Sequence, residues 1–67
     1  MTRVKVAPPT ATVELSQQEL VIIVNALNEV CNGFEITEFS TRIGADRQAA
    51  ERLLAAVRDV AKGVVEK

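Results

Sequence analysis

Residues 16–33 read SQQELVIIVNALNEVCNG, and this stretch predicts the best-defined helix of the chain. Ser16 and Glu19 make a capping box, in which the serine hydroxyl accepts a hydrogen bond from the first turn and the glutamate reaches back to the serine backbone. Apolar residues then recur at the helical spacing as one core stripe: Leu20, Ile23, Val24, Leu27, Val30 and Cys31. Asn32 and Gly33 are expected to supply the left-handed residue that ends the helix.

Two apolar residues of this helix, Val21 and Ile22, do not belong to the core stripe. At about 100° per residue, Ile22 points roughly opposite to it. We therefore expect either the N-terminal segment or a partner to cover these two side chains.

A short second helix is predicted over Ile36–Ile43. Ile36, Phe39 and Ile43 recur at spacings of three and four, and Thr37 can serve as the cap. Gly44 is expected to end this helix.

A third helix is predicted to begin at Asp46, which caps it, and to run to about Gly63 or beyond. Its apolar stripe contains Ala50, Leu53, Leu54, Val57, Val60, Ala61 and Val64. Because the connections are short, the three helices are expected to form a compact three-helix bundle, so that the fold class is mainly α.

Residues 1–15 are predicted to form an extended N-terminal arm that precedes the three-helix domain of residues 16–67. Apolar and polar residues alternate on both sides of Pro8-Pro9, with Val4 and Val6 before the prolines. The arm is a short hairpin, a stiff segment that packs on a neighbour, or disordered.

Composition limits the classes of function. The chain has 67 residues, one cysteine and no histidine, so an intramolecular disulfide is excluded and nearly every metal site built from imidazole or thiolate is removed. Cys31 lies on the core stripe, where a buried thiol is inert. Gly33, Gly44 and Gly63 are spaced as helix ends, not as a phosphate-binding loop. We therefore expect neither an enzyme nor a cofactor or small-molecule substrate, and we expect a cytoplasmic protein with no membrane span.

The formal net charge is −1, which argues against a protein that binds chiefly by covering phosphates. The charges are unevenly distributed. From Glu14 to Glu38 every charged residue is acidic, whereas four of the five arginines follow Phe39. The two halves of the domain therefore present different electrostatic surfaces.

Residues 36–54, ITEFSTRIGADRQAAERLL, resemble the helix-turn-helix of DNA-binding domains. Ser40 is small where the two helices would cross, and Gly44 gives the turn its backbone freedom. The resemblance implies that the helix beginning at Asp46 is a recognition helix and that the protein binds DNA as a dimer. The DNA-contacting residues would then be Arg42, Arg47, Gln48, Glu51 and Arg52.

The segments NALNEVCNG, residues 25–33, and EFSTRIG, residues 38–44, resemble small uncharacterised bacterial proteins. Some of these are loosely associated with toxin and immunity systems. This resemblance implies an immunity or antitoxin protein, whose acidic segment from Glu14 to Glu38 would mimic or block a nucleic-acid surface on a toxin.

The leading hypothesis is a non-enzymatic binding module that acts through protein–protein interaction or self-association. Its predicted interface residues are apolar and lie off the core stripe: Val4, Val6, Val21 and Ile22. DNA binding and inhibition of a toxin remain the two alternatives.

Overall fold

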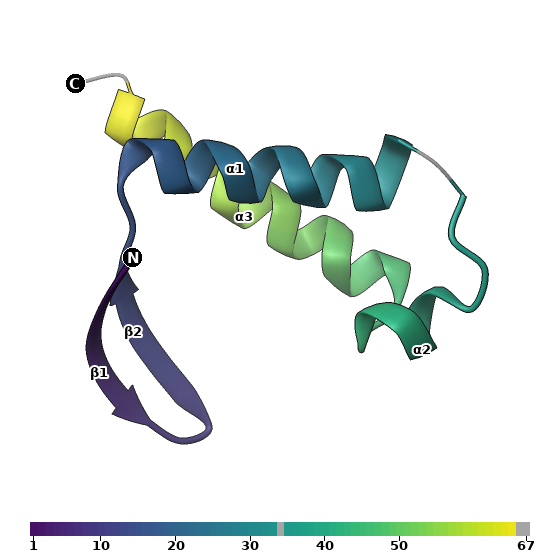
Figure 1. The fold of residues 1–67 in the computed structure, drawn as a ribbon, viewed down its shortest axis with the longest axis horizontal. Coiled ribbons are helices and arrows are strands. Elements are labelled where there is room, and N and C mark those ends of the chain that lie inside the picture. Colours follow the sequence, from purple (N-terminus) through teal and green to yellow (C-terminus); the bar gives the residue numbers. More distant parts are fainter. Residues whose placement is uncertain (34, 66–67) are drawn as a thin grey trace.

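The computed structural model describes residues 1–33 and 35–65 and shows a mainly helical chain that begins with a two-stranded hairpin (Figure 1). The elements are β1 (Thr2–Ala7), β2 (Thr10–Glu14), α1 (Gln17–Asn28), the π-helical turn η1 (Glu29–Gly33), α2 (Phe39–Ile43) and α3 (Arg47–Val65). The predicted mainly helical class is confirmed, and the N-terminal arm is a hairpin.

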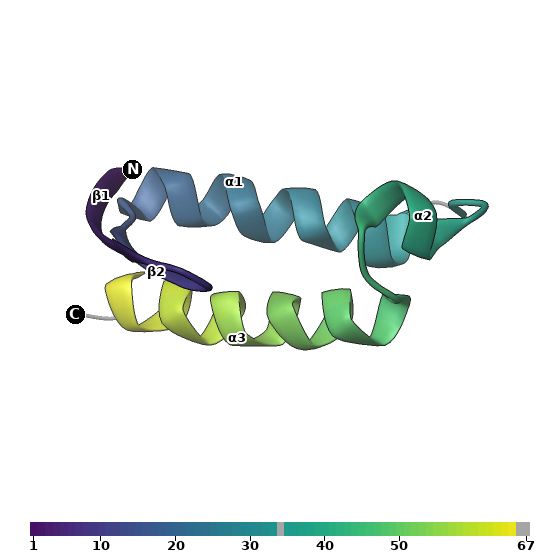
Figure 2. The same ribbon diagram turned by 90° about the horizontal axis from the view of Figure 1, so that it is seen from below.

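The helices α1 and α3 lie side by side and antiparallel, and their contact holds the fold together (Figures 1 and 2). The hairpin projects from one end of this pair, and α2 lies at the other end (Figure 1). The radius of gyration is 13.2 Å, against about 11 Å expected for a compact domain of this length. A compact bundle of three packed helices is not confirmed, because α2 has only five residues.

The capping box at the start of α1 is confirmed. The backbone N–H of Glu19 donates to Ser16 Oγ over 3.2 Å, and the backbone N–H of Ser16 donates to Glu19 Oε1 over 2.8 Å. The predicted end of this helix is wrong. Gly33 lies inside η1 and does not adopt the left-handed conformation, and the helix ends by widening into a π-helical turn. One carbonyl of this turn, that of Cys31, is satisfied by a distant side chain, Arg47.

The end of the second predicted helix is confirmed and its start is wrong. Gly44 has φ 90° at the C-cap of α2, in the left-handed region that glycine favours. The helix begins at Phe39, not Ile36, because Glu38 at the N-cap has φ 54° and cannot continue a helix. Thr37 therefore does not serve as the cap. Phe39 packs against the core, so tertiary packing decides where α2 begins.

Asp46 caps α3 as predicted, because its Oδ1 accepts a hydrogen bond of 2.8 Å from the backbone N–H of Ala49. The prediction that Gly63 marks a helix end is wrong, since α3 continues through it to Val65. Of the three glycines, only Gly44 has the left-handed φ of a helix end.

The core lies between α1 and α3 and is small. Among the described residues, four side chains are buried: Leu20, Cys31, Ala50 and Leu54. Cys31, Ala50 and Leu54 form one cluster, and Val24, Leu27 and Phe39 pack against it while remaining partly exposed. The core stripe of α1 is therefore confirmed, because Leu20 and Cys31 at its two ends are buried and Val24 and Leu27 between them pack on the core.

Part of the predicted apolar stripe of α3 is exposed and does not belong to the core. Leu53, Val60 and Val64 are 53%, 57% and 36% exposed, and we call these three residues the α3 edge. The residues that face α1 centre on Ala50 and Leu54. Leu53 and Val60 lie about 60° to 80° to one side of Ala50 around the helix axis. The apolar arc of α3 is thus wider than its contact with α1.

Every residue of the hairpin strands is exposed. The antiparallel register pairs Val6 with Ala11 and Arg3 with Val13, with an irregularity between Arg3 and Lys5. Because paired residues share a face and neighbours along a strand alternate, Val6, Ala11 and Val13 lie on one face together with Arg3. We call Val6, Ala11 and Val13, the apolar residues of this face, the hairpin face.

Candidate interaction surface

Among the residues that the structure describes, more large apolar side chains are exposed than buried. In the described residues these side chains are Met1, Val4, Val6, Val13, Val21, Ile22, Ile43, Leu53, Val60 and Val64. Single exposed apolar residues are normal, but contiguous patches mark surfaces that bind something. The grouping of these residues in space therefore decides whether they form a site.

Two open hollows lie beside the junction of the hairpin and the helices. The first is lined by Met1, Leu15, Glu19, Ile22 and Ile23. The second is lined by Leu15, Leu20, Ala56, Val57 and Val60. Leu15 belongs to both, so the apolar surface continues from α1 to α3 across this residue. Glu19 is the only residue with a charged side chain among those that line these two hollows.

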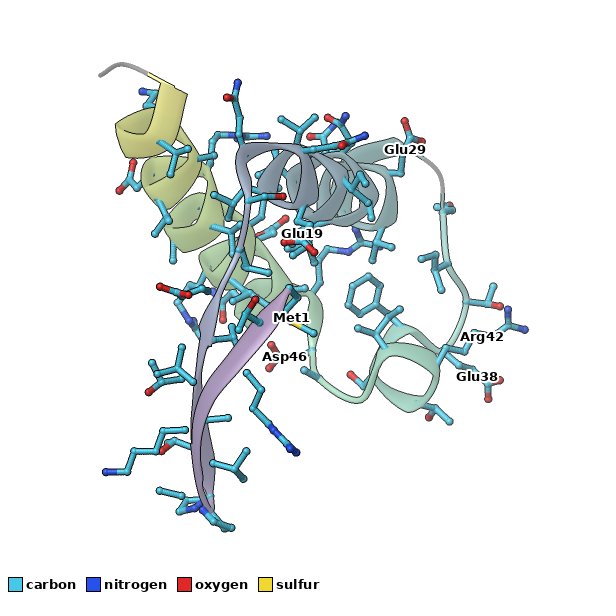
Figure 3. The ribbon with its side chains drawn as sticks, turned by 60° about the vertical axis from the view of Figure 1, so that its left-hand side comes forward. Met1, Glu19, Glu29, Glu38, Arg42 and Asp46 are labelled. Atoms are coloured by element: carbon cyan, nitrogen blue, oxygen red, sulfur yellow. The ribbon has the colours of Figure 1, made fainter. Side chains whose placement is uncertain are left out.

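A polar contact holds the start of the hairpin at the first hollow. The N-terminal ammonium group of Met1 donates to the Glu19 carboxylate, and the two residues lie beside each other in Figure 3. The same carboxylate accepts from the Ser16 backbone through its other oxygen. One side chain therefore both caps α1 and ties β1 to it.

The four predicted interface residues are all exposed, and they lie on two different elements. Val4 and Val6 on β1 are each 55% exposed, and Val21 and Ile22 on α1 are 44% and 59% exposed. Val21 and Ile22 are exposed, and the hairpin projects away from the helices (Figure 1). Of these four residues, only Ile22 lines either of the two hollows described above.

The structure places the predicted DNA-contacting residues in two different situations. Arg42, Gln48, Glu51 and Arg52 are exposed. Arg42 points outward from α2, on the same side as Glu38 (Figure 3). Arg47 is half-buried: its Nη1 donates to the Cys31 carbonyl over 2.6 Å, and its guanidinium lies 4.6 Å from the centre of the Phe39 ring. Arg47 therefore already makes two contacts inside the protein.

These contacts give Arg47 a structural role that the sequence reasoning missed. The last turn of α1 and the η1 turn contain no basic residue to balance the negative end of the helix dipole. Arg47 supplies that positive charge from the start of α3, where a cation is unfavourable for its own helix. The sequence did contain a signal for this role. An arginine at the first position of a helix is opposed by the dipole of that helix, which indicates that its guanidinium has a partner outside the helix.

Other chemistry is sparse in the part of the chain that the structure describes. Cys31 is a free thiol and is buried, as its place on the core stripe predicted. Residues 1–33 and 35–65 contain no group of three or more histidine, cysteine or acidic side chains that could hold a metal ion. None of the described helices has the length and apolar character that crossing a membrane requires.

Searches with this chain against protein-family models, curated proteins and solved structures found no match in any of the three. The exposed apolar surface is the feature of this molecule that bears on its function.

Proposed function

We propose that this protein is a non-enzymatic interaction module that binds a protein surface through apolar side chains which its own fold leaves uncovered. The partner is another protein or a second copy of the chain. One observation carries the proposal: ten large apolar side chains are exposed, while the described core consists of four buried residues. Burial of apolar surface is the main favourable term in protein association.

The hollow that contains Ile22 gives the proposal its first test. Ile22→Glu introduces a charge into an apolar contact without removing a core side chain, since Ile22 is 59% exposed. Asn25→Glu places the same charge at an exposed position of α1 that lines neither hollow, and it serves as the matched control. Circular dichroism should show the same helix content in both variants.

The assay is capture of partners by the immobilised protein from an extract of its native cell, together with the mass of the purified protein in solution. Ile22→Glu should lose a captured partner or a self-association that Asn25→Glu retains. Identical behaviour of the wild type and both variants would contradict binding through the hollow that contains Ile22. Unfolding by Ile22→Glu would also contradict it, because it would make Ile22 a core residue.

DNA binding is the second candidate, and the connection between α2 and α3 favours it. A three-residue turn, Gly44–Asp46, joins these helices, as in a helix-turn-helix. The duplex would then be contacted by the four exposed residues Arg42, Gln48, Glu51 and Arg52. Arg47 could contact the duplex only by breaking its contacts with Phe39 and Cys31. Binding to a labelled duplex should weaken steeply between about 50 and 200 mM salt. Arg52→Ala should relax the preference for particular bases more than Arg58→Ala does. If the fluorescence anisotropy of the labelled duplex does not change when the protein is added, DNA binding is excluded.

A further inference from the structure

We infer that the occupant of the exposed apolar surface is a second copy of this chain, in a symmetric dimer in which the hairpin face of each copy packs on the α3 edge of the other. This inference rests on the proposed function as an interaction module and names the partner. Four observations carry it: the area of the molecule, the isolation of the hairpin, the composition of the α3 edge and the direction in which the hairpin points.

The first observation is the accessible surface of the single chain, 5279 Å². A folded monomer of 7.3 kDa is expected to expose about 4,200 Å². The excess is therefore about 1,100 Å² per chain, which is close to what one partner contributes to a stable protein–protein interface. Contact between two copies would remove this excess from both chains at once.

The second observation is that, in the described part of the chain, the strands of the hairpin bury none of their side chains. Both strands are exposed along their whole length, and a two-stranded hairpin on its own is marginally stable in water. Its two sides differ. Val6, Ala11 and Val13 share one side of the hairpin with Arg3, the partner of Val13, whereas the paired residues Lys5 and Thr12 lie on the opposite side. The side that carries the hairpin face is the more apolar of the two, so it is the side suited to lie on an apolar surface.

The third observation is that the α3 edge lies in an uncharged strip of the helix. Positions 49, 53, 56, 60 and 64 are alanine, leucine, alanine, valine and valine, and they recur at spacings of three and four. Depletion of charge is the feature that distinguishes the centre of an interface from the rest of a protein surface. Val60 also lines the second hollow, so a side chain from another molecule has a recess to enter.

The fourth observation explains why the hairpin does not cover the α3 edge of its own chain. Only Leu15 and Ser16 separate β2 from α1, and the capping box holds Ser16 in place. The hairpin is thereby directed away from the helices (Figure 1). In a two-fold dimer the same contact is made twice, so each copy supplies the covering that the other lacks.

The test is the solution mass by sedimentation equilibrium from about 5 to about 500 μM protein. The wild type is expected to sediment at about twice its 7.3 kDa monomer mass. Val13→Lys and Val60→Lys should each weaken the dimer by about 100-fold or more, because each substitution occurs twice in the interface. The matched controls are Thr12→Lys, on the polar side of the hairpin, and Ala55→Lys, on another face of α3, and both should remain dimeric.

Mixing two variants tests the reciprocal contact itself. Val13→Lys and Val60→Glu should each be monomeric alone and form a heterodimer when mixed. One contact of that heterodimer is unchanged, and the other places opposite charges together. Three results would overturn the inference: a monomeric wild type, variants that dimerise as well as their controls, or a mixture that stays monomeric. A monomeric wild type that still captures a different protein through Ile22 would overturn the dimer and leave the proposed function standing.

Discussion

Replacement of Arg47 by alanine tests whether this side chain joins the end of the first helix to the start of the third. The substitution removes the hydrogen bond to the Cys31 carbonyl, 2.6 Å long, and the contact with the Phe39 ring. A hydrogen bond from a charged group contributes about 1.5 to 3 kcal/mol, and a cation above an aromatic ring adds about 0.5 to 1 kcal/mol. Arg47 is half-buried, so solvent screening places the expected loss of stability near the lower end, at about 2 kcal/mol.

The assay is urea unfolding followed by circular dichroism at a fixed protein concentration. With a slope near 1 kcal/mol per molar urea, typical of a small domain, Arg47→Ala should lower the midpoint by about 2 M. Arg52→Ala, an exposed arginine of the same helix, should change stability by no more than about 0.5 kcal/mol. Repeating Arg47→Ala in a Phe39→Leu background should reveal a coupling of about 0.5 to 1 kcal/mol from the ring. If Arg47→Ala were as stable as Arg52→Ala, the assigned role of Arg47 would be wrong.

Four further predictions concern single residues of the fold. Gly44→Ala should lower the free energy of unfolding by about 1 to 2 kcal/mol, because φ is 90° there and no neighbouring atom obstructs a methyl group. Gly63→Ala should instead raise it by up to about 1 kcal/mol, since Gly63 is helical and equally unobstructed, and the same sign for both in thermal unfolding would contradict this account. Ser16→Ala should cost about 1 kcal/mol in urea unfolding through loss of the capping box, and an unchanged midpoint would remove its assigned contribution. Cys31 should react with a chromogenic thiol reagent only as fast as the protein opens, because the thiol is buried, and immediate reaction of the native protein would place it at the surface.

The parts of the fold that local chemistry determines could be predicted from the sequence. Ser16 and Glu19 specify the start of α1, Asp46 specifies the start of α3, and Gly44 adopts the left-handed conformation that ends α2. In each case a side chain or a glycine acts on backbone within a few residues of itself. Such contacts are present in the sequence pattern without knowledge of the rest of the molecule.

The predictions from the sequence were wrong where contacts with a distant part of the chain determine the local structure. Gly33 is not a left-handed cap, and one carbonyl at this helix end is satisfied by Arg47, sixteen residues away from Cys31. Leu53 and Val60 satisfy the helical spacing, yet both remain exposed. Helical spacing identifies the apolar side of α3, but it does not show how much of that side the neighbouring helix covers. The second hollow could not be foreseen for the same reason. It depends on how Leu15 and α3 meet, which the periodicity of neither segment encodes.

The small number of buried residues has a consequence for how long the protein persists in a cell. A molecule that binds only the folded state stabilises it by an amount that grows with the logarithm of its concentration, about 2.7 kcal/mol at a hundred times the dissociation constant. For a chain whose described core is four buried side chains, that increment is a large share of the free energy that separates folded from unfolded chains. Under the proposed function, the steady-state amount of this protein therefore rises with the concentration of its partner, which in the inferred dimer is the chain itself.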